Sequence, residues 1–150
     1  MATALNMTMK LKQDPTSQAK LAGLKAAFAG HVQADMDRAL RGSQIVHFAR
    51  VLVIDNLYIQ VITEFDGDKE AYTDFFRKAL PDVFKAIFEV VEGAPAWAEL
   101  NDRDTFYAFS KDKNLRSLGS NADDDTEGYL FDVTNGKTVK QILQTPAAAR

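Results

Sequence analysis

The chain has 150 residues, of which 46% are hydrophobic and 26% are charged, a balance typical of a single globular domain. Its net charge of −3 argues against a nucleic-acid-binding protein, because such proteins usually present a basic face. The absence of cysteine excludes disulfides, thiolate nucleophiles and cysteine-based zinc or iron–sulfur sites.

No segment predicts export or insertion into a membrane. Met1–Lys12 lacks the long apolar run after a basic stretch that marks a signal peptide. No stretch approaches the roughly 18 apolar residues of a membrane-spanning helix. We therefore expect a cytoplasmic protein without a membrane span.

The chain begins with a predicted strand and a long predicted helix. Leu5–Leu11 alternates apolar and polar residues, which is typical of a half-buried strand. Thr16–Leu40 repeats apolar residues every three or four positions, as one face of a helix does. Gly23 and Gly30 lie inside this pattern, where the helix can bend or admit another backbone. Gly42 is expected to cap its end.

Two adjacent segments predict a β-hairpin at the centre of the sheet. Ile45–Ile54 is nearly continuous in apolar and β-branched residues, which predicts a strand. Asp55–Asn56 predicts a two-residue turn, and Leu57–Phe65 predicts the returning strand. Since the turn lacks the usual glycine after Asp or Asn, a slightly longer loop is the alternative.

The next segment predicts a helix interrupted by proline. Asp68 is suited to cap a helix that starts at Lys69 and buries aromatic residues. Pro81 should break this helix, and Asp82 should cap its continuation. A short helix over Arg103–Phe109 follows.

The C-terminal third predicts a loop, a strand and a helix. Ser117–Thr126 is expected to form a loop, and Gly128–Thr134 a final strand. Asn135–Gly136 predicts a turn. Thr138–Gln144 predicts a closing helix, and Thr145–Arg150 a frayed tail.

The order of these elements predicts one α+β domain over residues 1–150. Without the closing helix it reads β-α-β-β-α-β, the pattern of a ferredoxin-like sandwich with an antiparallel sheet. An insert of about 94–127 precedes the last strand. In such a fold both helices cover one face of the sheet. We expect a second copy of the chain to cover the other face, which makes the protein a homodimer.

Three short runs carry a resemblance to a known group of proteins. They are IVHFAR at Ile45–Arg50, FDGD at Phe65–Asp68 and TVKQIL at Thr138–Leu143. The chain resembles uncharacterised bacterial ferredoxin-like domains of the dimeric α/β-barrel superfamily. That superfamily includes small-molecule monooxygenases, haem-degrading enzymes, chlorite dismutases and dye-decolorising peroxidases. The resemblance implies the fold and a dimer, and it carries over no set of catalytic residues.

His47 and Arg50 are the first candidates for a functional role. His47 could act as a general base or as a haem or metal ligand, or a neighbour could satisfy its ring in a structural role. Strand alternation places Arg50 on the face opposite His47 unless a bulge intervenes. Arg50 could instead pair with Glu64 or Asp66 and position the turn. His31, the other histidine, is expected to be structural or on the surface.

Four residues of the returning strand are further candidates for ligand binding. Tyr58, Gln60, Ile62 and Glu64 should share the open face of the sheet, because the opposite set is more uniformly apolar. A face that mixes aromatic and polar groups suits a small-ligand pocket and also a dimer interface. The sequence leaves both interpretations open.

Two acidic clusters could bind a metal ion or could have an ordinary structural role. Asp66, Asp68 and Glu70 have a calcium-like spacing, but the full loop pattern is missing, so a turn and a helix cap are favoured. Asp123–Asp125 with Glu127 is expected to form a solvated loop. No metal site is predicted.

The sequence favours a function without catalysis. Phosphate-binding glycine loops, nucleophile elbows and the His-Glu-x-x-His motif are all absent. We expect a homodimer that binds a small, partly apolar molecule or a protein partner, with no cofactor. The alternative is an oxidoreductase of the monooxygenase or haem-protein kind in which His47 is the base or the haem ligand.

Overall fold

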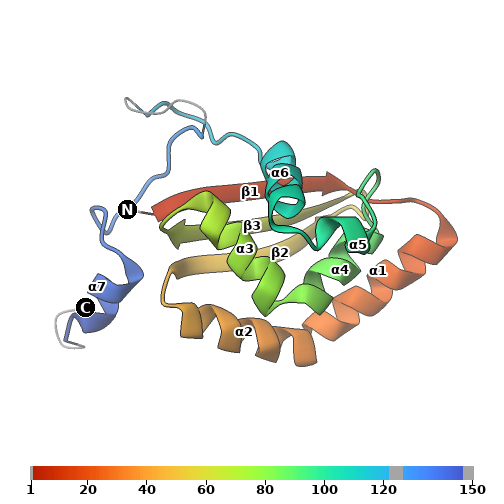
Figure 1. Ribbon diagram of the computed structural model, residues 1–150, viewed down its shortest axis with the longest axis horizontal. Helices are drawn as coiled ribbons and strands as arrows, with labels where there is room; N and C mark the ends of the chain where they lie inside the picture. The colour runs from red at the N-terminus through yellow and green to blue at the C-terminus, as the bar shows by residue number, and fades with distance from the viewer. Residues whose placement is uncertain (1, 122–126, 147–150) are drawn as a thin grey trace.

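The computed structural model describes residues 2–121 and 127–146, which form an α+β structure (Figure 1). Within these residues there are seven helices and one three-stranded antiparallel sheet. The helices α3 to α6 lie across the face of the sheet that Figure 1 turns to the viewer. None of the helices described is both long and apolar enough to cross a bilayer.

The sheet confirms the predicted hairpin. Its strands are β1 (Ala2–Lys10), β2 (Val46–Ile54) and β3 (Tyr58–Asp66), in the order β1-β3-β2. Asp55 and Asn56 both adopt positive φ, 52° and 55°, which Asp and Asn tolerate better than most residues. The Leu57 N–H donates to the Ile54 carbonyl at 2.8 Å, so the turn has two residues and the longer loop is wrong.

The predicted long helix is two helices, α1 (Pro15–Phe28) and α2 (His31–Ser43). Asp14 caps α1 by accepting the Ser17 N–H at 3.0 Å. The chain breaks at Ala29–Gly30, where Gly30 leaves the helical region with φ −121° and ψ −120°. The expected cap at Gly42 is also wrong, because α2 continues through Gly42 and the left-handed residue is Gln44, at φ 56°.

Four more helices complete the layer on the sheet: α3 (Lys69–Ala79), α4 (Pro81–Glu89), α5 (Trp97–Leu100) and α6 (Arg103–Lys113). Asp68 caps α3 as predicted, since its carboxylate accepts the Ala71 N–H at 2.9 Å. Pro81 is the first residue of α4, the helical position that proline prefers. Asp82 therefore lies inside the first turn, and the prediction that it caps α4 is wrong.

The hydrophobic core lies between one face of the sheet and the helices. Phe65 of β3 stacks on Tyr72 of α3 with ring centroids 3.9 Å apart. Phe84 of α4 packs between Phe76 and Phe106, at 5.2 and 5.5 Å between centroids. The sheet contributes alternate residues to this core, namely Leu5, Met7, Met9, Ile59, Val61, Thr63 and Phe65.

The predicted last strand, Gly128–Thr134, is wrong, because the chain runs there without strand pairing. The outer edge of β1 is instead occupied by the two residues that follow α6. The Leu115 N–H donates to the Asn6 carbonyl at 2.9 Å, and the Asn6 N–H donates to Oδ1 of Asn114 at 2.6 Å. With these positions taken on the free edge, a further strand has little room to pair with the middle of β1.

The end of the chain follows the remaining predictions. Asn135 and Gly136 form a turn with φ of 59° and 80°. Thr138 caps α7 (Val139–Gln144) through a reciprocal capping box. The loop expected over Ser117–Thr126 and the tail expected over Thr145–Arg150 extend into 122–126 and 147–150, which lie outside the described residues.

A buried hydrogen bond between sheet and helix makes one prediction about stability. The hydroxyls of Thr63 and Tyr72 lie 2.6 Å apart, and burial raises the pKa of Tyr72 well above its usual value. Tyr72→Phe leaves the Thr63 hydroxyl buried without its partner, so we expect urea unfolding to show a loss of about 1–2 kcal/mol. Tyr72→Phe combined with Thr63→Val should cost less than the sum of the single changes, whereas strict additivity would contradict this account.

Candidate functional site

The face of the sheet opposite the helices is partly open. It presents alternate side chains of all three strands: Ala4, Thr8, Lys10, Phe48, Arg50, Leu52, Ile54, Tyr58, Gln60, Ile62 and Glu64. Several large apolar side chains here reach solvent, with Phe48 74%, Tyr58 42% and Ile54 39% exposed. This confirms the predicted facing of Tyr58, Gln60, Ile62 and Glu64, since the residues between them are buried.

A β-bulge brings His47 and Arg50 to the same side of the sheet. Val46 pairs with Phe65 and Phe48 pairs with Glu64, so His47 is an extra residue in the register. The extra residue cancels the alternation that would place His47 opposite Arg50. Both side chains line one pocket. The bulge that a joint site of His47 and Arg50 required is therefore present.

His47 is held by a carboxylate. Its Nε2 lies 2.8 Å from Oδ1 of Asp66, and both side chains are about 10% exposed. Because an ionised carboxylate only accepts hydrogen bonds, Nε2 is the ring nitrogen that donates here, and Nδ1 takes no part in this bond. A neighbour therefore satisfies the ring of His47, as the structural interpretation of this residue proposed.

Asp66 also fixes the C-terminal segment. Its second oxygen, Oδ2, accepts the N–H of Val139, the first residue of α7, at 2.7 Å. Helix α7 has six residues and none of them is buried. A helix this short is marginal without tertiary contacts, so the bond from Asp66 is an important part of what holds it in place.

Asp66→Ala is expected to release α7 and to loosen His47. The change leaves the Nε2–H of His47 and the N–H of Val139 without a partner, which should cost about 1–3 kcal/mol. Hydrogen exchange at the amides of α7 should become faster. Asp68→Ala is the matched control, because Asp68 caps α3 and does not touch α7. Unchanged exchange in α7 of Asp66→Ala would contradict this role.

The pocket beside His47 has a volume of about 230 Å³. It lies where β2 begins and β3 ends, and the segment 130–134 forms its outer wall. The side chains lining it include His47, Phe48, Arg50, Glu64 and Phe131. One oxygen of Glu64, Oε2, is buried there without a hydrogen-bond partner. A buried acceptor without a hydrogen bond destabilises the fold, so a ligand that donates a hydrogen bond to this oxygen would be favoured here.

Asp132 also borders the pocket, but its carboxylate is already occupied. It accepts the N–H of Thr134 at 2.8 Å, the Thr134 hydroxyl, and the N–H of Gly136 at 3.1 Å. The hydrogen bonds from Thr134 lower the pKa of Asp132 below its ordinary value, and His47 adds a smaller contribution in the same direction. Asp132 therefore shapes the turn that forms the wall.

The structure brings together three of the six predicted ligand-binding residues. His47, Arg50 and Glu64 line the pocket, whereas Tyr58, Gln60 and Ile62 lie further along the same open face. Gln60 donates to the hydroxyl of Thr8 at 3.0 Å across the strand pair. The predicted pairing of Arg50 with Glu64 or Asp66 is wrong: among the ion pairs of the described residues, Asp66 takes His47 and Arg50 takes no carboxylate.

Two aromatic residues of the pocket, Phe48 and Phe131, were not predicted from the sequence to bind a ligand. Phe48 was not considered as a binding residue, although its place two residues before Arg50, on the same face of the strand, was the available signal. Phe131 lies in a segment predicted to be a strand, and nothing in its local pattern placed it beside Phe48.

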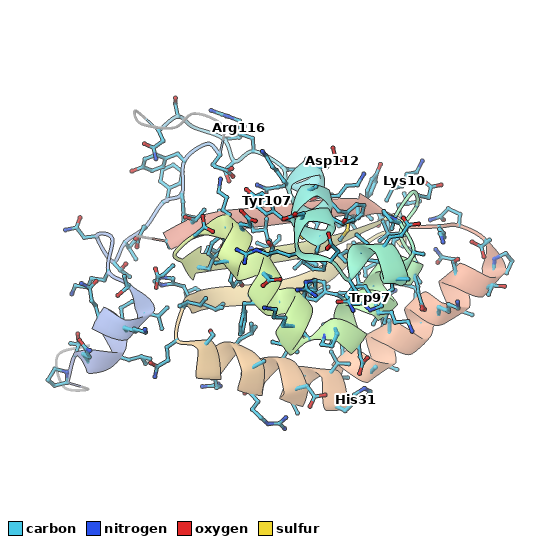
Figure 2. The ribbon with its side chains drawn as sticks, viewed as in Figure 1. Lys10, His31, Trp97, Tyr107, Asp112 and Arg116 are labelled. Atoms are coloured by element: carbon cyan, nitrogen blue, oxygen red, sulfur yellow. The ribbon has the colours of Figure 1, made fainter. Side chains whose placement is uncertain are left out.

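The remaining predicted charged residues do not assemble into a site. His31 starts α2 and points away from the body of the molecule (Figure 2). Glu70 pairs with Arg103 at 3.4 Å, and Asp68 caps α3, so Asp66, Asp68 and Glu70 have separate partners. Within the part of the chain that is described, no three His, Asp or Glu side chains could hold a metal ion together. Asp123–Asp125 lies outside the described residues.

Comparison of the chain with protein-family models, with curated proteins and with solved structures gives no match. The resemblance to dimeric α/β-barrel domains therefore stays a prediction. The open sheet face and the pocket beside Arg50 and Glu64 are the features on which a functional interpretation depends.

Proposed function

We propose that the chain is a homodimer that binds a small, partly apolar molecule at its open sheet face and does not catalyse a reaction. The observation that carries this proposal is the exposure of Phe48 and Tyr58 on a sheet whose other face is the core. A broad face with several exposed apolar side chains marks an interaction surface.

A second copy of the chain is the occupant that this face fits best. Lys10 pairs with Glu92 at 3.6 Å, and Arg50 and Glu64 carry opposite charges, so two copies of the face meet without strong repulsion. In a two-fold interface each patch meets its own copy, and the face needs no other complementary protein. Tyr58 near one end of the face suits such a contact, because tyrosine is enriched at interfaces.

The ligand site is proposed at the other end of the face. The pocket of about 230 Å³ is smaller than the roughly 300–1,000 Å³ of sites for drug-sized molecules, so its ligand is small. Phe48 and Phe131 offer apolar contact, while Arg50 and Glu64 offer charge. The central and hairpin parts of the face remain for the dimer contact.

We infer that the fold is a ferredoxin-like sandwich with an incomplete sheet. The strand order β1-β3-β2 and the helices on one face support this relation. Asn114 and Leu115 bind Asn6 on the edge of β1 where the fourth strand of a complete ferredoxin-like sheet would pair.

Native mass spectrometry of the purified protein tests the proposed function. We expect a dimer that carries a small molecule, which denaturing conditions then release for identification. An inert, ligand-free monomer would count against the proposal.

The oxidoreductase alternative has one supporting observation, the hydrogen bond between His47 and Asp66 beside a pocket. A carboxylate that orients a histidine is common where the ring acts as a base or ligand. Because Nε2 is taken by Asp66, Nδ1 is the nitrogen left for such a role. A haem titration without a change in the Soret band, together with no oxygen uptake on quinol substrates, would remove this alternative.

A further inference from the structure

We propose that the pocket beside His47 binds a free α-amino acid with an apolar side chain. This inference rests on the proposed function and gives its ligand a chemical class. It comes from two charges of opposite sign that lie close together between exposed aromatic side chains and form no ion pair with any described residue.

Arg50 and Glu64 lie diagonally on neighbouring strands. Phe48 pairs with Glu64 across the sheet and Arg50 pairs with Ile62, so the two charged residues are one step apart on the same face. Diagonal neighbours in a sheet have Cα atoms about 7–8 Å apart, so one small ligand can reach the charged ends of both side chains. The structure shows no ion pair between the two, and Oε2 of Glu64 has no hydrogen-bond partner.

The other charged groups around the pocket are already paired. Asp66 holds His47 and Val139, and Asp132 holds Thr134 and Gly136. One guanidinium and one carboxylate are therefore left to meet a ligand. A zwitterion satisfies both at once, with its carboxylate on Arg50 and its ammonium group on Glu64.

The apolar part of the ligand is expected to lie between two phenylalanines. Phe48 is 74% and Phe131 83% exposed, and both line the pocket. Covering these rings removes apolar surface from water and favours binding. A volume of about 230 Å³ suits a single small molecule rather than a peptide. A purely ionic ligand would leave both rings exposed.

Three matched probes test the class of ligand by isothermal titration calorimetry of the full chain. They are L-phenylalanine, 2-phenylethylamine, which lacks the carboxylate, and 3-phenylpropionate, which lacks the ammonium group. We expect L-phenylalanine to bind at least about tenfold more tightly than either of the others, because each of them leaves one protein charge unpaired.

Two variants assign the charges. Arg50→Gln should abolish the preference for L-phenylalanine over 2-phenylethylamine, and Glu64→Gln should abolish the preference over 3-phenylpropionate. Each change is on the open face and away from the core, so the fold should persist. A variant that weakens all three probes equally would contradict the assignment of its charge.

The outcomes separate this inference from the proposed function. Equal affinities for the three probes would remove the amino-acid class while keeping an apolar ligand site at the face. Failure of all three to bind at millimolar concentration would overturn the inference, and a dimer with a different molecule in its native mass spectrum would still support the proposed function. A monomer that binds none of the three probes and carries no other molecule would contradict both the amino-acid inference and the proposed function.

Discussion

Tyr58→Lys is expected to convert the dimer into a monomer. The substitution places a charge on the open face, where Tyr58 is 42% exposed in the single chain. Loss of an aromatic contact that is buried in an interface costs about 2 kcal/mol or more, and a two-fold interface contains the position twice. The combined cost of about 4 kcal/mol weakens dimerisation about a thousandfold, which light scattering coupled to gel filtration will detect.

Leu57→Lys is the matched control for this experiment. Leu57 is the adjacent residue and is 43% exposed, but it closes the hairpin turn before β3 begins and lies outside the open face. The Leu57→Lys variant should therefore remain a dimer, although it introduces the same charge. If both variants remained dimeric, the open face would not be the interface, and if both became monomeric, the effect would not be specific to that face.

Phe84→Ala is expected to be the most destabilising single change in the described core. The Phe84 ring is 2% exposed and lies within 5.8 Å of three other phenylalanine rings, centroid to centroid. Removing a buried phenylalanine ring leaves a cavity and costs about 3–5 kcal/mol. A domain of this kind has about 5–15 kcal/mol of stability in total, so much of it would be lost. Urea unfolding measures the change directly.

Phe131→Ala provides the comparison for the core substitution. Phe131 is 83% exposed, so the same truncation removes little buried surface from the single chain. Its expected effect on unfolding is within about 0.5 kcal/mol. Comparable losses from the two substitutions would mean that Phe84 does not have the packing role described here.

Elements set by local chemistry could be predicted from the sequence. Asp68 caps α3, Thr138 caps α7 and Asp55–Asn56 forms the hairpin turn, because each depends on residues within a few positions. The face of β3 that packs on the core followed from the alternation of Tyr58–Glu64 with more apolar residues. Such signals need no knowledge of distant parts of the chain.

The failures have physical causes outside the local pattern. Whether Gly128–Thr134 forms a strand depends on whether the edge of β1 is free. Asn114 and Leu115 bind Asn6 on that edge, although they lie more than a hundred residues after it in the sequence. The facing of His47 depended on one extra residue in the pairing with β3, which the sequence of β2 alone does not reveal. The sequence therefore identified His47, Arg50 and Glu64 as separate candidates, but it did not predict that they line one pocket.

The central claim is that a second copy covers the open face of the sheet. Sedimentation equilibrium of the unmodified chain at micromolar concentration tests it most directly. We predict a single species of twice 16.6 kDa, the mass of one chain. A species of 16.6 kDa that does not associate as the concentration rises would contradict the claim.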